Sequence, residues 1–87
     1  MASPAPNAFQ QLLDFLLRLE QARIHYSLAH FRAETVAVEV VVPGERWEIE
    51  FFADGAVEVE VFSSVGPNGI ELQGPEAIER LFATHSD

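Results

Sequence analysis

The chain has 87 residues, 48% of them hydrophobic, and carries fourteen acidic and five basic side chains for a formal net charge of −9. This length predicts one domain with a single hydrophobic core. The excess of carboxylates argues against nucleic acids and anionic membranes as direct partners, because both are negatively charged. The absence of cysteine excludes disulfides and thiolate metal sites, and it fits a cytoplasmic protein.

The chain is expected to begin with a short tail followed by a helix. Residues 1–6 contain small side chains and two prolines, which predicts a flexible tail, and residues 7–85 are expected to form a single α+β domain. Asn7 is a favoured N-cap, and from Ala8 to Arg23 apolar residues recur with helical spacing. The expected buried stripe consists of Phe9, Leu12, Leu13, Leu16 and Leu19, with Phe15 and Leu17 widening it.

Four segments then alternate in polarity with the period of a β-strand. They are 24–31, Thr35–Val42, Arg46–Ala53 and Ala56–Ser63, and their β-branched and aromatic content strengthens the prediction. Residues 70–72 could add a short strand, and Pro75 opens a final helix. The predicted fold is α+β: a helix, a four-stranded antiparallel meander and a helix, with both helices on the valine-rich face of the sheet.

The turns fix how the strands pair. A two-residue Asp54-Gly55 turn would place Phe51 opposite Glu58, whereas a three-residue turn that includes Ala53 places Phe51 opposite Val57. We therefore expect the three-residue turn, with Gly55 in the left-handed region. The turn at Pro43-Gly44 leaves two alternatives. A two-residue loop pairs Glu39 with Glu48, and a four-residue loop pairs Glu39 with Glu50.

This register gathers glutamates on the face opposite the valines. Three interpretations stay open for that face: a solvated sheet surface, a docking surface for a basic protein, and a divalent metal site, which a flat sheet favours least. Apolar side chains interleaved with the acids favour docking, since apolar groups on an exposed face often mark an interface. The candidate partner-binding residues are Glu39, Glu48, Glu50, Glu58, Glu60, Val41, Phe52 and Phe62.

Other chemistry-bearing residues give weaker signals. His25 and His30 are five positions apart, so on one strand they point to opposite faces and form no joint metal site. Trp47 and Tyr26 are expected in the core. The serines have no recognisable base near them in the sequence, and the glycine spacing matches no phosphate loop. We therefore predict no catalytic residue, no metal and no cofactor.

The segment 42–52 (VPGERWEIEFF), followed by Asp54-Gly55 and 57–60 (VEVE), resembles a family of short uncharacterised bacterial proteins. That resemblance implies no activity, cofactor or catalytic residue. The size, acidity and helix–sheet layout are also similar to those of immunity proteins of bacterial toxin systems, a likeness of architecture alone.

The predicted function is a non-catalytic bacterial interaction module that docks on a protein partner through the glutamate face. A basic protein is the partner that this face matches best. The first alternative is a self-associating domain, a homo-oligomer whose exposed sheet pairs with a copy of itself. The second is a metal- or small-molecule-binding enzyme with a pocket lined by Trp47, Tyr26 or the histidines.

Overall fold

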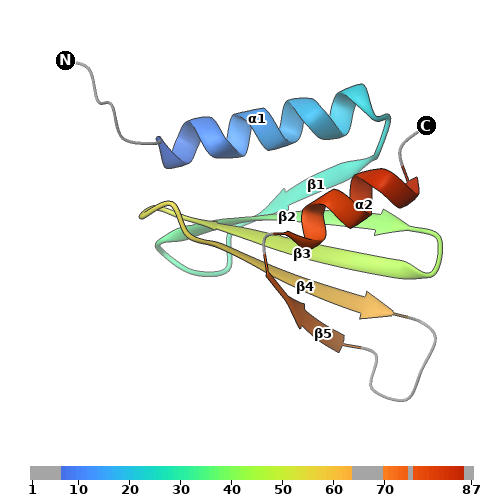
Figure 1. Cartoon of the computed structure of the whole chain (residues 1–87). Helices are drawn as coiled ribbons and strands as arrows, with labels where there is room; N and C mark the ends of the chain where they lie inside the picture. The colour runs from blue at the N-terminus through green and yellow to red at the C-terminus, as the bar shows by residue number, and fades with distance from the viewer. Residues whose placement is uncertain (1–6, 64–69, 75, 86–87) are drawn as a thin grey trace.

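The structure, a computed structural model, describes residues 7–63, 70–74 and 76–85. The elements are α1 (Ala8–Gln21), β1 (Tyr26–Ala29), β2 (Thr35–Val42), β3 (Glu45–Phe52), β4 (Val57–Ser63), β5 (Ile70–Gln73) and α2 (Ala77–His85). The predicted α+β order of a helix, an antiparallel meander and a helix is confirmed (Figure 1). The short strand considered at residues 70–72 is present as β5, so the sheet has five strands in the order β1-β2-β3-β4-β5. The expected tail and Pro75 lie outside the described residues.

Both ends of α1 are capped by local sequence. Asn7 Oδ1 accepts hydrogen bonds from the backbone N–H groups of Phe9 at 2.9 Å and Gln10 at 3.2 Å, as expected of an N-cap. The helix ends at Gln21, before the predicted Arg23, because Arg23 adopts a left-handed φ of 61°. The next amide, that of Ile24, then donates to the carbonyl of Leu19 at 2.9 Å. This arrangement is a Schellman motif, which reverses the chain toward β1.

Both predicted turns can be checked against the register. Phe51 pairs with Val57, so the turn between β3 and β4 has three residues, and Gly55 has a φ of 95° as expected. Val42 pairs with Glu45, so the turn between β2 and β3 has two residues. That result selects the alternative in which Glu39 lies opposite Glu48.

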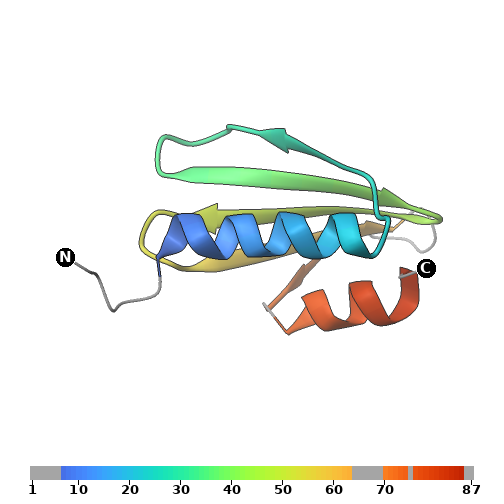
Figure 2. The ribbon, with the colours of Figure 1, turned by 90° about the horizontal axis from the view of Figure 1, so that it is seen from above.

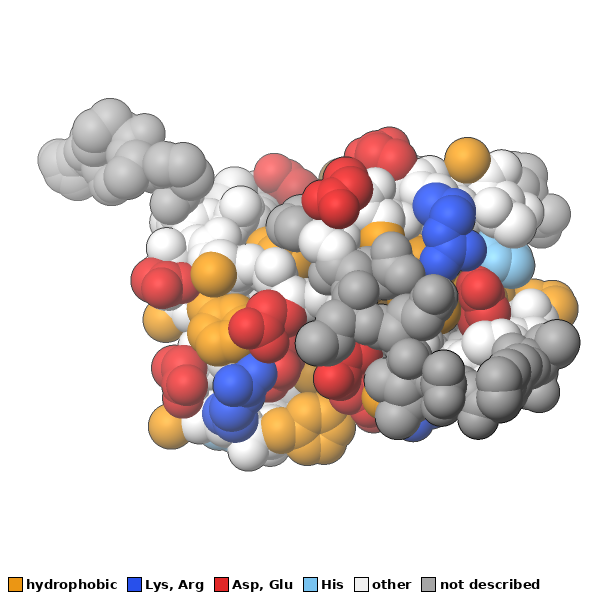
Figure 3. All heavy atoms as spheres, turned by 60° about the horizontal axis from the view of Figure 1, so that its bottom comes forward, with side chains coloured by type: hydrophobic (Ala, Val, Ile, Leu, Met, Phe, Trp, Pro, Cys, Tyr) orange, Lys and Arg blue, Asp and Glu red, His pale blue; other side chains and the backbone are white. Residues whose placement is uncertain are grey.

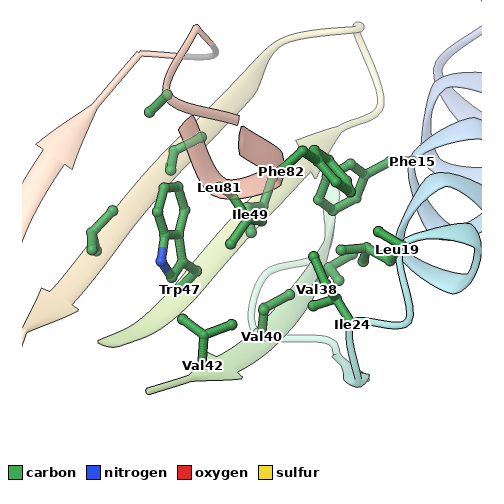
Figure 4. Close-up of a cluster of buried hydrophobic side chains, with 14 of the residues drawn as sticks. Phe15, Leu19, Ile24, Val38, Val40, Val42, Trp47, Ile49, Leu81 and Phe82 are labelled. Atoms are coloured by element: carbon green, nitrogen blue, oxygen red, sulfur yellow. The ribbon is translucent and has the colours of Figure 1, made fainter. Parts of the chain in front are cut away.

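The core lies between the valine-rich face of the sheet and the two helices. Both helices are on the same side of the sheet in Figure 1, and Figure 2 shows them next to each other above it. Trp47, expected in the core, is fully buried and lies beside Leu81 of α2 (Figure 4). The ring centroid of Phe15 lies 5.3 Å from that of Phe51 and 5.9 Å from that of Phe82. Phe15 therefore joins α1, β3 and α2 in one cluster.

The orientation of α1 differs from the prediction. Its buried residues are Leu12, Phe15 and Leu19, whereas Phe9 and Leu13, which we expected inside, are exposed. The reason is that α1 contacts two elements, the sheet below it and α2 beside it. Phe15 is thereby drawn into the core, and the opposite flank of the helix is left in water.

Candidate functional site

The five glutamates predicted as site residues lie on the sheet face opposite the helices, which we call the open face; they are Glu39, Glu48, Glu50, Glu58 and Glu60. Three of them form one row across β2, β3 and β4, because Glu39 pairs with Glu48 and Glu48 pairs with Glu60. We call these three residues the acidic row. In the neighbouring row Glu50 pairs with Glu58. Like charges directly opposed on a sheet cost about 0.2–1 kcal/mol a pair, so this face carries unfavourable electrostatic energy.

The carboxylates differ in their exposure to water. The side chain of Glu58 is 60% exposed, whereas that of Glu50 is 17% exposed and that of Glu48 is 22% exposed. Glu39 and Glu60 are half-buried. On the side of the molecule that Figure 3 turns forward, acidic side chains are interspersed with hydrophobic and cationic ones. The predicted site residues are therefore brought together on one surface, and the two described helices lie on the other side of the sheet.

Arg32, in the loop between β1 and β2, reaches across the open face to two glutamates. Its Nε donates to Glu50 Oε2 at 3.1 Å, one terminal nitrogen donates to Glu50 Oε1, and the same nitrogen donates to Glu58 Oε1 at 3.3 Å. The buried Thr35 hydroxyl also donates to Glu50 Oε2, at 2.8 Å. The hydrogen bonds from Arg32, and then the one from Thr35, lower the pKa of Glu50 against the opposing effect of burial.

A second arginine lies within the face itself. Arg46 on β3 donates to Glu48 Oε2 at 2.7 Å, and its guanidinium carbon lies 4.1 Å from the centroid of the Phe62 ring. Within the described residues, Glu39 and Glu60 take part in no ion pair. Two arginines thus offset part of the acidic face, and among the described residues no cation pairs with the two outer members of the acidic row.

An apolar strip lies directly beside the acidic row. Val41, Arg46 and Phe62 are Cα partners across β2, β3 and β4, and each lies two residues along its strand from the member of the acidic row, on the same face. Val41 is 70% exposed, and with Arg46 and Phe62 it lines a shallow hollow of about 380 Å³. Phe62 and Phe52 are half-buried, and each lies near the guanidinium group of an arginine. Val41 is therefore the most accessible apolar side chain among the predicted site residues.

Sequence reasoning missed the roles of Arg32, Arg46 and Thr35. Strand alternation already placed Arg46 on the face of Glu48, so its ion pair could have been anticipated from the two-residue spacing. Nothing in the periodicity of the chain connects Arg32 with Glu50. The contact of Arg32 with Glu50 depends on the path of the loop between β1 and β2.

The remaining candidates are dispersed. His25 and His30 are exposed, and His85 Nε2 lies 3.7 Å from Glu45 Oε1, whose carboxylate also accepts a hydrogen bond from Trp47. In the part of the chain that the structure describes, no group of three or more His, Asp or Glu side chains is placed to hold a metal ion. Neither described helix has the length and hydropathy of a membrane span.

In comparisons with known proteins, the chain matches no family model, and no similar protein was found among curated proteins or solved structures. The family resemblance drawn from the segment 42–52 stays a prediction.

Proposed function

We propose that this chain is a non-catalytic interaction module that binds a basic protein through its open face, in a bacterial cytoplasm. The observation that carries the proposal is the acidic row. Three carboxylates lie in direct cross-strand register, and within the described residues an arginine pairs with the middle one alone. A cationic side chain placed over Glu39 or Glu60 would relieve repulsion that the free protein retains.

The neighbouring apolar strip narrows the chemistry of the partner. A partner that binds here should present an apolar side chain for the hollow beside Val41 and Phe62, flanked by lysine or arginine for the acidic row. Apolar anchors surrounded by charged groups are a common arrangement in protein interfaces. A blocking role of the kind that immunity proteins have is consistent with this surface, since its described residues offer charged and apolar groups for binding a partner.

The alternative of self-association through the sheet is less favourable on this face. Stacking two open faces would bring five carboxylates and two arginines of one copy against the same groups of the other. Charge repulsion across such a contact suppresses binding. The acidic row therefore favours a basic partner over a second copy at this surface.

The test compares two variants of equal charge. Glu39→Gln with Glu60→Gln removes the two uncompensated carboxylates of the acidic row, and Glu34→Gln with Glu76→Gln removes two exposed carboxylates outside it. Each tagged chain is used to capture proteins from its native cytoplasm, and the captured proteins are identified by mass spectrometry. Purified partner is then titrated by calorimetry at low and high salt.

We expect a basic protein that the first variant loses and the second retains, with affinity that falls as salt increases. Recovery of the same proteins by both variants, or binding that does not depend on salt, would reject the open face as the docking surface.

A further inference from the structure

A second surface, away from the open face, is formed by the flank of α1 that the core leaves in water. Phe9, Leu13 and Leu17 recur every fourth residue, so they form one ridge along the helix. All three are large, apolar and exposed. The residues that face the core from the same helix are Leu12, Phe15 and Leu19.

This flank faces the β1 side of the molecule. Near the end of α1, the Tyr26 hydroxyl on β1 donates to Glu20 Oε2 at 2.6 Å. At the beginning of α1, Phe9 and His30 line the same hollow of about 280 Å³. On β1, Leu28 pairs with the buried Val38 and yet is itself exposed. The ridge and Leu28 therefore both lie on the β1 side of the molecule. We call these four exposed apolar residues, Phe9, Leu13, Leu17 and Leu28, the α1–β1 surface.

The α1–β1 surface is large enough to supply the apolar part of one side of a protein interface. With exposed fractions of 64%, 41%, 53% and 53% for its four members, it leaves about 400 Å² of apolar area in water, compared with about 300–600 Å² for the largest patch on a typical monomer. A standard interface buries about 800 Å² on each partner, of which a little over half is apolar. The exposed apolar area is thus close to what one side of a specific interface requires.

The shape and charge of the surface indicate its occupant. Ridges formed by every fourth residue on one helix pack into the grooves between the same kind of ridges on a second helix. This is the commonest class of helix contact in globular proteins. None of the four members is charged, and Glu20, which borders them, is engaged by Tyr26. A basic partner would find no carboxylate to pair with among these four, whereas a second copy brings a matching apolar ridge without charge repulsion at the centre.

We propose that two copies of this chain associate through the α1–β1 surface about a two-fold axis near Leu13. In a two-fold contact the same patch is used on both copies, so the ridge of one helix packs antiparallel on the ridge of the other. Leu28 of each copy then lies beside the contact. The open faces stay free on the opposite side of each sheet, so this dimer is compatible with docking of a partner and independent of it.

The test uses the oligomeric state and site-specific cross-linking. Sedimentation velocity of the full chain across micromolar concentrations should show a species of twice the 9.7 kDa chain mass. Leu13→Glu and Leu17→Glu should each sediment as monomers at concentrations where the unaltered chain is a dimer. Val41→Glu, a matched change on the open face, should remain dimeric. Circular dichroism of each variant establishes that it is folded.

Cross-linking keeps the test decisive if a glutamate variant fails to fold. Because the chain has no cysteine, a single Leu13→Cys substitution should form an intermolecular disulfide on mild oxidation, and Val41→Cys should not. A chain that stays monomeric throughout the concentration range would overturn the proposal. Faster cross-linking of Val41→Cys than of Leu13→Cys would also overturn it and would assign self-association to the open face.

Discussion

Repulsion within the acidic row can be measured directly as stability. Glu39 and Glu60 both lie opposite Glu48, and neither takes part in an ion pair with a described residue. Replacing both with glutamine removes two opposed like-charge pairs while keeping the shape of the side chains. At about 0.2–1 kcal/mol a pair, the free energy of unfolding should increase by about 0.4–2 kcal/mol. For a domain of this size, each 1 kcal/mol corresponds to a rise in Tm of about 4–8 °C.

The measurement is urea unfolding followed by fluorescence of Trp47, the single tryptophan of the chain, which is fully buried in the folded state. The control is the Glu34→Gln and Glu76→Gln pair, which removes the same number of negative charges at exposed positions outside the row. Near 1 M salt, where the screening length shrinks to about 3 Å, the difference between the two variants should narrow. Equal stability of the two variants at low salt would refute the idea that the row is electrostatically strained.

Two further predictions concern the core and the arginine contact. Leu19→Ala, at a fully buried position of α1, should lower the free energy of unfolding by about 2–5 kcal/mol in the same urea assay, and a loss well under 1 kcal/mol would contradict its place in the core. The folded-state pKa of Glu50 lies below the ordinary value of 4.5, so its carboxylate stabilises the fold above that pH and loses this contribution as the pH falls through the lowered pKa. Glu50→Gln should therefore be less stable than the unaltered chain at neutral pH, and below pH 4.5 it should lose less stability than the unaltered chain does. Parallel acid-unfolding profiles of the two proteins would show that Arg32 and Thr35 contribute nothing to stability through Glu50.

Strand alternation carried most of what the sequence could predict. Because successive side chains in a strand point to opposite faces, the pairing of Phe51 with Val57 placed the glutamates opposite one another. The same register settled the loop length, because a three-residue turn places Phe51 opposite Val57, and Gly55 has the left-handed φ that such a turn takes. These are local rules, and they hold wherever one face of a sheet is buried.

The features that were not predicted depend on contacts between distant segments. Phe9 and Leu13 are exposed although we expected them inside, and the position of α2, whose Phe82 contacts Phe15, decides which flank of α1 is buried. A helical stripe that is apolar over a wide angle does not specify which of its residues will face a second helix. The bridge from Arg32 to Glu50 likewise spans a loop and two strands, and no spacing rule connects its ends.

The order of the strands also bears on how the chain reaches its fold. Each strand of the meander pairs with its neighbour in the sequence, so the sheet is assembled from contacts of low contact order. The packing of Phe15 against Phe82 instead joins the two ends of the chain and closes a long loop. Hairpin formation around Gly55 can therefore precede the docking of the helices, and substitutions in the β3–β4 turn should slow folding more than substitutions at Phe82 do.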